Sequence, residues 1–339
     1  MKQKHVLLIL IAVFVIGAAI VGYIALRPEV PTHNNGTPKK VVINEAVRNL
    51  LYLPLYHAKE KGFFAEEGLD VEIVTGGTAT NSFAAMLSGD ANFSQADPMY
   101  VPISREKGSR TKVVASVVGR IAVWGVSKDP NIQEITRDTL KGKTIATQPR
   151  PMTAYTYTIK MINDFGLTPD RDVKIIETKP PNEIIPFLNG QADYAMTIEP
   201  ATSTTVSQGA HVVLSYPKLL GDQVFTGLMT TEDYISSNPD VVQAVVNAYQ
   251  RALRDLHENP ESGIATARVY FPQLSDSVLQ LAVKRLTDEK VFPLNVQIPE
   301  ESWNKAIKVR VDVGDLKTAA PFNEGVASSF AENAIKQYP

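Results

Sequence analysis

The chain has 339 residues, which is room for roughly two domains of about 150 residues each. Apolar residues make up 44% and charged residues 21%, a balance that is typical of soluble globular proteins and excludes disorder and collagen-like repeats. The formal net charge of -2 provides no basic field for nucleic acid, and the absence of cysteine excludes disulfides, a thiolate nucleophile and a cysteine-bound metal.

The N-terminal segment has the pattern of a membrane anchor or a signal segment. Within residues 1–27, two lysines precede an uncharged, mostly apolar run from Val6 to Leu26. At about 1.5 Å per residue this run can span a bilayer of about 30 Å, and the lysines orient the remainder of the chain away from the cytoplasm. The alternative is a secretory signal that is cleaved after Ala19. Residues 28–40 predict a flexible linker, so both alternatives place the protein in the periplasm or on the outer face of the cell membrane.

From residue 41 onward, strand-like and helix-like segments alternate, which predicts βαβ units and mainly parallel sheets. The first half has strand candidates at 41–43, 71–74 and 91–94 and helix candidates at 55–67 and 80–87; the second half has strand candidates at 143–146, 173–177 and 192–196 and helix candidates at 154–164 and 183–188. Glycine turns recur at matching places: Val42 lies 47 positions before Gly89, and Thr144 lies 46 positions before Gly190. This repeat predicts two similar α/β lobes.

The remaining segments indicate how the lobes are connected. The strand candidates 122–127 and 225–229 are expected to carry the chain to the second lobe and back, which makes a two-strand hinge beside an interlobe cleft. Further helical patterns lie at 241–258, 275–287 and 300–315. We therefore expect an α/β protein in which residues 41–125 with 226–339 form lobe I and residues 126–225 form lobe II.

The sequence contains no recognisable catalytic, nucleotide-binding or metal-binding motif. The five histidines lack the spacing that would place two on one metal ion, and no Gly-x-Ser-x-Gly elbow is present. Gly142-Lys143-Thr144 resembles the end of a P-loop, but Arg137 occupies the place of its first glycine, and the loop precedes a strand instead of following one. We therefore expect no catalytic residue, no metal and no cofactor.

Ligands of open α/β lobes bind beyond the carboxyl ends of the strands, and this rule selects the loops that follow the predicted strands. The candidate ligand-binding residues on these loops and beside the lobe crossings are Arg48, Asn49, Tyr52, Gly77, Thr78, Thr80, Gln95, Asp97, Arg120, Trp124, Arg150, Thr153, Tyr155 and Glu199. Several have a structural alternative. Asp97 and Glu199 precede a proline where a helix begins, so capping alone accounts for them. The arginines are alternatively surface charges, and Trp124 is alternatively a core residue instead of a stacking platform.

The run from Ala58 to Glu72 (AKEKGFFAEEGLDVE) resembles the NMT1/THI5-like periplasmic binding proteins, the class for nitrate, sulfonates, taurine and thiamine precursors. Stretches at 87–93, 140–146 and 188–194 resemble the same family in the same order. The resemblance implies a type II periplasmic-binding fold, and it implies ligand contacts at the following residues: Gly77, Thr78, Gln95, Asp97 and Glu199. The chain departs from the family in its second-lobe loop, QPRPMT at 148–153, which is usually rich in glycine and serine, and in having no cysteine for a lipid anchor.

These observations predict a receptor that closes on a small organic solute and delivers it to an ABC permease with its ATPase. Asp97, Glu199 and the aromatic residues favour a planar heterocyclic or aromatic ligand of thiamine-pyrimidine type, because two acids at mirrored positions would repel an anion. Arg48 and Arg150 support the alternative, an anion such as an alkanesulfonate, taurine, nitrate or a phosphonate. Alternatives of another class are a sensory domain and a small-molecule enzyme. We expect a monomer that binds no nucleic acid and contacts the membrane through its N-terminal segment.

Overall fold

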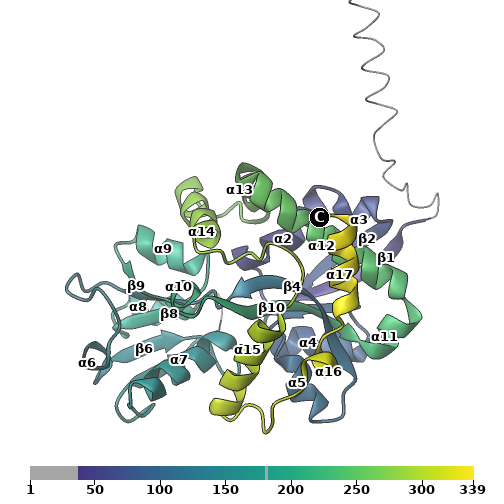
Figure 1. Cartoon of the computed structure of the whole chain (residues 1–339). Coiled ribbons are helices and arrows are strands. Elements are labelled where there is room, and N and C mark those ends of the chain that lie inside the picture. Colours follow the sequence, from purple (N-terminus) through teal and green to yellow (C-terminus); the bar gives the residue numbers. More distant parts are fainter. Residues whose placement is uncertain (1–36, 180–181) are drawn as a thin grey trace, which may run out of the picture. The chain divides into compact units, whose positions relative to one another are not determined.

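The structure, a computed structural model, describes residues 37–179 and 182–339 and contains two five-stranded sheets flanked by helices (Figure 1). The predicted anchor, residues 1–27, and residues 28–36 of the predicted linker lie outside the described residues. Within the described part of the chain, no helix is both long enough and apolar enough to cross a membrane.

The sheet of lobe I has the strand order β2-β1-β3-β10-β4. Its strands are β1 (Lys39–Glu45), β2 (Leu69–Thr75), β3 (Phe93–Ala96), β4 (Thr111–Arg120) and β10 (Asp222–Thr231). Strand β1 pairs in parallel with β2 and β3, whereas β10 runs antiparallel to β3 and β4. Strand β3 is buried at all four of its positions and β4 at the six consecutive positions 113–118, so the core of the lobe lies on both faces of this sheet.

The sheet of lobe II has the strand order β7-β6-β8-β5-β9. Its strands are β5 (Trp124–Ser127), β6 (Thr144–Thr147), β7 (Lys174–Glu177), β8 (Tyr194–Thr197) and β9 (His211–Ser215). Strand β6 pairs in parallel with β7 and β8, as β1 does with β2 and β3. The predicted fold class, with two similar α/β lobes, is therefore confirmed.

Helices cover both sheets. Those of lobe I are η1 (Leu50–Tyr52), α2 (Leu53–Glu60), α3 (Phe63–Glu66), α4 (Ala79–Ser88), α5 (Tyr100–Arg105), α11 (Glu232–Ser237), α12 (Pro239–Glu258), α13 (Pro260–Tyr270), α16 (Phe322–Gly325) and α17 (Ser328–Gln337). Those of lobe II are α6 (Arg137–Leu140), α7 (Thr153–Asp164), η2 (Asn182–Ile184), α8 (Ile185–Leu188), α9 (Ala201–Ser207) and α10 (Tyr216–Leu220). Gly62 separates α2 from α3 at φ 75°, a conformation that favours glycine, so the expected helix over 55–67 is interrupted there.

The chain passes between the sheets at residues 121–123 and again at 216–221, and two C-terminal helices bridge the lobes. Helix α14 (Asp276–Asp288) packs against α13 of lobe I and α9 of lobe II, and α15 (Glu300–Asp312) packs against β10 of lobe I and α7 of lobe II (Figure 1). The lobes are therefore held together by side-chain contacts of these two helices as well as by the crossings.

Candidate functional site

A small cavity lies between the lobes, at the carboxyl ends of strands from both sheets. Asn49, Tyr52 and Asp97 line it from lobe I, and Gln148 and Thr153 line it from lobe II. These residues lie on the segments that follow β1, β3 and β6, where α/β proteins commonly bind ligands. The cavity volume is about 40 Å³, close to the ~30 Å³ that one water molecule occupies in the liquid. A larger solute therefore enters only when the lobes separate.

A buried ion network connects the lobes beside this cavity. Arg310 on α15, which is 2% exposed, donates to the carboxylate of Asp97, which is 8% exposed, and to Asp315 at 2.6 Å. The same guanidinium donates to the Thr156 hydroxyl, and the Thr153 hydroxyl donates to Asp97. Both threonines lie on α7 of lobe II, whereas the three charged residues belong to lobe I. The network therefore joins the two lobes.

The charges of this network compensate each other only in part. Burial alone would lower the pKa of Arg310, but the charges of Asp97 and Asp315 outweigh burial and raise it, so the guanidinium stays protonated. One cation beside two carboxylates has a formal charge of about -1 at neutral pH. Among the described residues that line the cavity there is no lysine, arginine or histidine. An anionic solute would therefore meet a net negative charge at this site.

The remaining lining suits an uncharged and partly apolar molecule. Met152, Ile198 and Phe225 contribute apolar surface, and Tyr52 contributes an aromatic ring with one hydroxyl. Burial raises the pKa of Tyr52, so its phenol stays neutral at physiological pH. Apolar walls with a few polar groups are the usual composition of small-molecule sites.

Four of the predicted ligand-binding residues meet at this cavity: Asn49, Tyr52, Asp97 and Thr153. Their roles as ligand contacts stay predictions, but their common location fits the strand-end rule from which they were selected.

The other predicted residues lie outside the lining and have neighbours of their own. In lobe I these are Arg48 (donating to Glu45, 2.7 Å), Gly77 (an exposed turn, φ 79°), Thr78 (accepting from the amide of Asn81, 3.1 Å), Thr80 (beside the Tyr100 hydroxyl, 2.9 Å), Gln95 (accepting from Tyr249) and Arg120 (donating to Asp222, 2.8 Å). In lobe II they are Trp124 (donating to Glu289, 2.8 Å), Arg150 (donating to Glu177, 2.9 Å), Tyr155 (its ring 4.9 Å from the Arg150 guanidinium) and Glu199 (accepting from Arg285, 2.7 Å). As ligand contacts they stay predictions; the contacts seen here are structural.

Trp124 and Glu199 show most clearly what these structural contacts do. Both side chains are fully buried. Trp124 donates a hydrogen bond to Glu289, directly after α14, and Glu199 accepts one from Arg285 on α14, so both bonds connect lobe II to this helix. Burial raises the pKa of Glu199, and the charge of Arg285 opposes this rise. These two residues therefore lie where the C-terminal bridge meets lobe II, and neither belongs to the lining of the interlobe cavity.

Several residues at the site were absent from the predicted set, among them Gln148, Arg310 and the apolar side chains of Met152, Ile198 and Phe225. Gln148 belongs to a loop that the sequence analysis had located, but that loop offered no reason to prefer its first residue. Arg310 lies on α15 at helical spacing from the buried Trp303, Ala306 and Ile307. A charged residue on the apolar side of a helix was the signal that could have identified it, because buried charges require partners.

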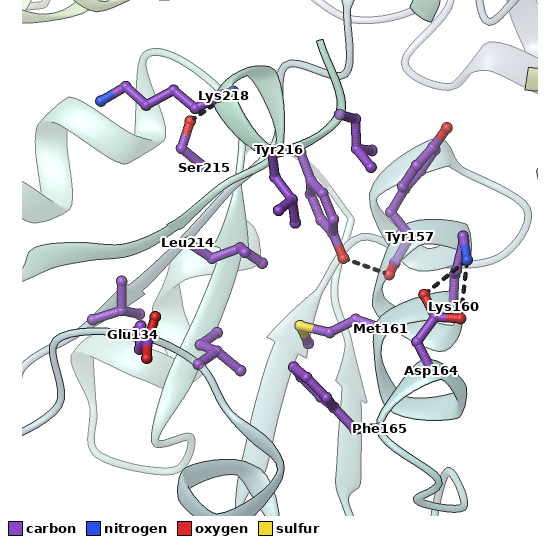
Figure 2. Close-up of a pocket in the computed structure, with 14 residues that line it drawn as sticks. Glu134, Tyr157, Lys160, Met161, Asp164, Phe165, Leu214, Ser215, Tyr216 and Lys218 are labelled. Carbon is purple, nitrogen blue, oxygen red and sulfur yellow. Dashed lines mark hydrogen bonds and ion pairs between the residues drawn. The ribbon is translucent and has the colours of Figure 1, made fainter. Parts of the chain in front are cut away.

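A larger cavity of about 550 Å³ lies within lobe II, between α7, β9 and α10 (Figure 2). Met161, Phe165 and Leu214 give it apolar walls, and two pairs of its polar groups bond to each other: the Tyr216 hydroxyl donates to the Tyr157 carbonyl oxygen at 2.8 Å, and the Lys160 ammonium donates to Asp164 at 2.7 Å (Figure 2). It does not lie at the carboxyl ends of the central strands. Size alone therefore does not select it as the binding site.

Comparisons with known proteins agree with this geometry. The sequence model described as NMT1/THI5 like matches residues 49–263. "Putative binding protein YtlA" of Bacillus subtilis is 23% identical over 306 residues, which are 89% of this chain and 91% of that protein. The riboflavin-binding protein RibY of Chloroflexus aurantiacus is 26% identical over 257 residues, 70% of this chain and 68% of that protein.

Similar solved structures share the fold. The alkanesulfonate-binding protein SsuA from Xanthomonas axonopodis, bound to MOPS, has a TM-score of 0.66 and 18% identity, with 88% of this chain and 98% of that chain covered. Most of the similar structures are binding proteins, but the desulfurization enzyme DSZB also matches, with a TM-score of 0.63 and 12% identity over 89% of this chain and 100% of that chain. The fold alone therefore does not separate binding from catalysis.

Proposed function

Because the chain belongs to the NMT1/THI5-like family, we propose that it is an extracytoplasmic solute-binding protein of an ABC importer. The observation that carries the proposal is the cavity between the lobes, which is lined by strand-end residues of both sheets. Proteins of the same fold include periplasmic binding proteins for aliphatic sulfonates and for nitrate, which supports the same role and the same side of the membrane here. The chain offers no thiolate, and the described residues contain no cluster of potential metal ligands, which favours binding over catalysis.

Capture of the solute requires the lobes to open and close. We take lobe I as residues 41–125 with 226–339 and lobe II as residues 126–225, except that β5, from Trp124, belongs to the sheet of lobe II and β10, from Asp222, to the sheet of lobe I. The crossings at 121–123 and 216–221 are the places where the backbone must bend. Thr153 and Arg310 make hydrogen bonds between the lobes, so a ligand that enters between the lobes must replace or complement those contacts. Only a ligand that binds the closed state more tightly than the open state shifts the population toward it.

The preferred solute is an uncharged heterocyclic or aromatic molecule, as a thiamine-type pyrimidine would be. The partly apolar lining and the net negative charge of the Arg310 network support this class over an anion. The similarity to RibY, whose name states a riboflavin-binding function, supports it independently. The second candidate is an organic anion, which the similarity to SsuA favours, and which would have to displace Asp97 or Asp315 from Arg310.

A thermal-unfolding panel on the full chain distinguishes the two candidates. At a concentration of 100 times its Kd, a ligand stabilises the folded state by about 2.7 kcal/mol. We expect stabilisation by riboflavin or by a hydroxymethylpyrimidine, and none by taurine, MOPS or nitrate. Stabilisation by the sulfonates alone would refute the heterocycle and support the anion. Mass spectrometry of the recovered ligand tests the enzyme alternative, because a binding protein returns its solute unchanged.

A matched pair of substitutions locates the binding site. Phe225 lines the interlobe cavity and Phe165 lines the larger cavity of lobe II, and both rings are half-buried. We expect Phe225→Ala to abolish most of the ligand-induced stabilisation and Phe165→Ala to preserve it. The reverse result would move the site to the cavity in Figure 2 and overturn the interlobe proposal.

The cellular part of the proposal has separate tests. Recovery of the protein in the membrane fraction with its N-terminus intact would support the anchor, whereas an N-terminus after Ala19 would support a cleaved signal. Recovery in the cytosol would refute both. Light scattering on the purified chain tests the expected monomer, and co-purification with a permease and its ATPase tests the importer.

A further inference from the structure

Gln148 has an amide group that the folded chain leaves without a hydrogen bond. Among the described residues, four buried side chains have a polar atom without a partner: Asn44, Gln95, Gln148 and Trp303. Of these four, only Gln148 lines the interlobe cavity, where its Nε2 group is the orphan atom. The side chain is 3% exposed, so bulk water does not reach it freely. An unpaired buried amide in a native protein needs an explanation, such as a bound molecule.

Two neighbouring polar groups of the cavity, those of Asp97 and Asn49, are already occupied. Asp97 accepts from a backbone amide at 2.9 Å, from the Thr153 hydroxyl and from Arg310. Asn49 accepts from a backbone amide at 2.8 Å and donates to a backbone carbonyl at 3.2 Å. These groups shape the cavity wall, but their hydrogen bonds are committed to the protein. Of these three groups, Gln148 is therefore the one whose donor is free to form a hydrogen bond with a ligand.

We propose that Gln148 determines ligand specificity by donating a hydrogen bond to an uncharged acceptor on the solute, a ring carbonyl or a ring nitrogen. This inference rests on the proposed function and specifies its substrate class. The acceptor is uncharged because an anionic one would face the net negative Arg310 network. The ring that bears the acceptor packs on the apolar side chains of Met152 and Phe225.

The position of Gln148 also couples recognition to closure. The residue follows β6 of lobe II, whereas Asn49, Tyr52 and Asp97 belong to lobe I. A solute held against lobe I gains the bond to Gln148 only when lobe II closes on it. The bond therefore contributes to the closed state and little to the open one, which is the differential affinity that a closing receptor requires.

The test compares Gln148→Met with the wild-type full chain in two measurements. Methionine has a similar length but no donor, so the substitution removes the orphan amide without opening a large cavity. In urea unfolding without ligand we expect the variant to be as stable as the wild type or more stable, because it no longer buries an unpaired donor. In titration calorimetry with riboflavin and with a hydroxymethylpyrimidine, we expect the probe that binds the wild type to bind the variant about tenfold more weakly. Gln208→Met, at an exposed position of the same lobe, is the matched control and changes neither quantity.

Each outcome decides the inference. If the variant is clearly less stable without ligand, the amide is bonded within the folded chain. If the affinity is unchanged, the amide does not touch the ligand. Either result overturns the role of Gln148 and leaves the receptor proposal intact. If neither heterocycle binds the wild type, the heterocyclic substrate class itself fails and this inference fails with it.

Discussion

Replacing Arg310 by methionine tests whether the buried ion network holds the two lobes together. The substitution leaves the Asp97 carboxylate almost fully buried without its cation, and it removes the hydrogen bonds to Thr156 and Asp315. Breaking a buried pair by removing one partner typically costs about 3–5 kcal/mol. At roughly 2 °C per kcal/mol for a chain of this size, the midpoint of thermal unfolding should fall by about 6–10 °C.

A double-mutant cycle separates the ion pair from the loss of packing. Asp97→Asn removes the buried charge and keeps one oxygen, which accepts from the backbone amide of Met99. Its NH2 group replaces the oxygen that accepts from Thr153, and the Thr153 hydroxyl then accepts instead of donating. Since that charge is what Arg310→Met exposes to a low-dielectric site, we expect the double variant to be about 1–3 kcal/mol more stable than the sum of the two single losses implies. The assay is urea unfolding followed by far-ultraviolet circular dichroism.

The control for this cycle is an ion pair on the surface. Arg254 donates to Glu258 one helical turn along α12 at 2.8 Å, and both side chains are largely exposed. Exposed pairs of this kind contribute about 0–1 kcal/mol, so Arg254→Met should change the unfolding free energy little. If Arg310→Met were no more damaging than Arg254→Met, the network would not be holding the lobes, and the reasoning about closure would be refuted.

Two further predictions concern a buried histidine and a close backbone approach. Burial lowers the pKa of His57 below its usual value of about 6.5. Between these two values the unfolded chain binds a proton that the folded chain does not, so the free energy of unfolding should fall as the pH drops through this window. The urea midpoints of His57→Gln should lack this dependence on pH. At Gly227 an added Cβ would lie 2.6 Å from Val113, so Gly227→Ala should cost about 1–3 kcal/mol, whereas Gly119→Ala, 3.1 Å from Pro293, should cost less in the same unfolding assay.

The repeated pattern of the sequence was sufficient to predict the lobes, because its signals are local. Val42 and Thr144 each lie in the first parallel strand of their lobe. The glycine turns at Gly89 and Gly190 follow the helix that precedes the third parallel strand of each lobe. Such turns depend only on neighbouring residues, so they can be read without knowing the fold. The parallel pairing of β1 with β2 and β3, and of β6 with β7 and β8, followed from the alternation of these segments.

Strand β4 shows why other elements were missed. The sequence pattern predicts no strand at Thr111–Arg120, although β4 is one of the two longest strands of the lobe I sheet. Six consecutive residues, 113–118, are buried, so apolar and small side chains point to both faces and no alternation appears. A strand that is covered on both faces lacks the period of two from which a half-buried strand is recognised.

The candidate site was predicted at the level of loops but not of side chains. The strand-end rule located the loops of Asp97 and Thr153, and both side chains turn into the cavity. Arg48, on the loop after β1, and Arg150, on the loop of Thr153, turn away because each has a carboxylate of its own lobe within hydrogen-bonding distance. Side-chain direction depends on such partners, and a sequence pattern does not contain them. The partner of Asp97, Arg310, lies 213 positions along the chain.

The ion pairs of the arginines determine whether these residues favour an anionic solute. An anion was the alternative ligand because Arg48 and Arg150 lie on strand-end loops, but their pairing with Glu45 and Glu177 leaves each charge matched within its own lobe. Arg310, which does lie beside the cavity, is matched twice. An anionic solute would therefore have to break an existing ion pair before it gained one, and its net gain would be the difference of two similar interactions. An uncharged solute breaks none of these pairs, and this difference is the physical reason for expecting a heterocycle in the cleft.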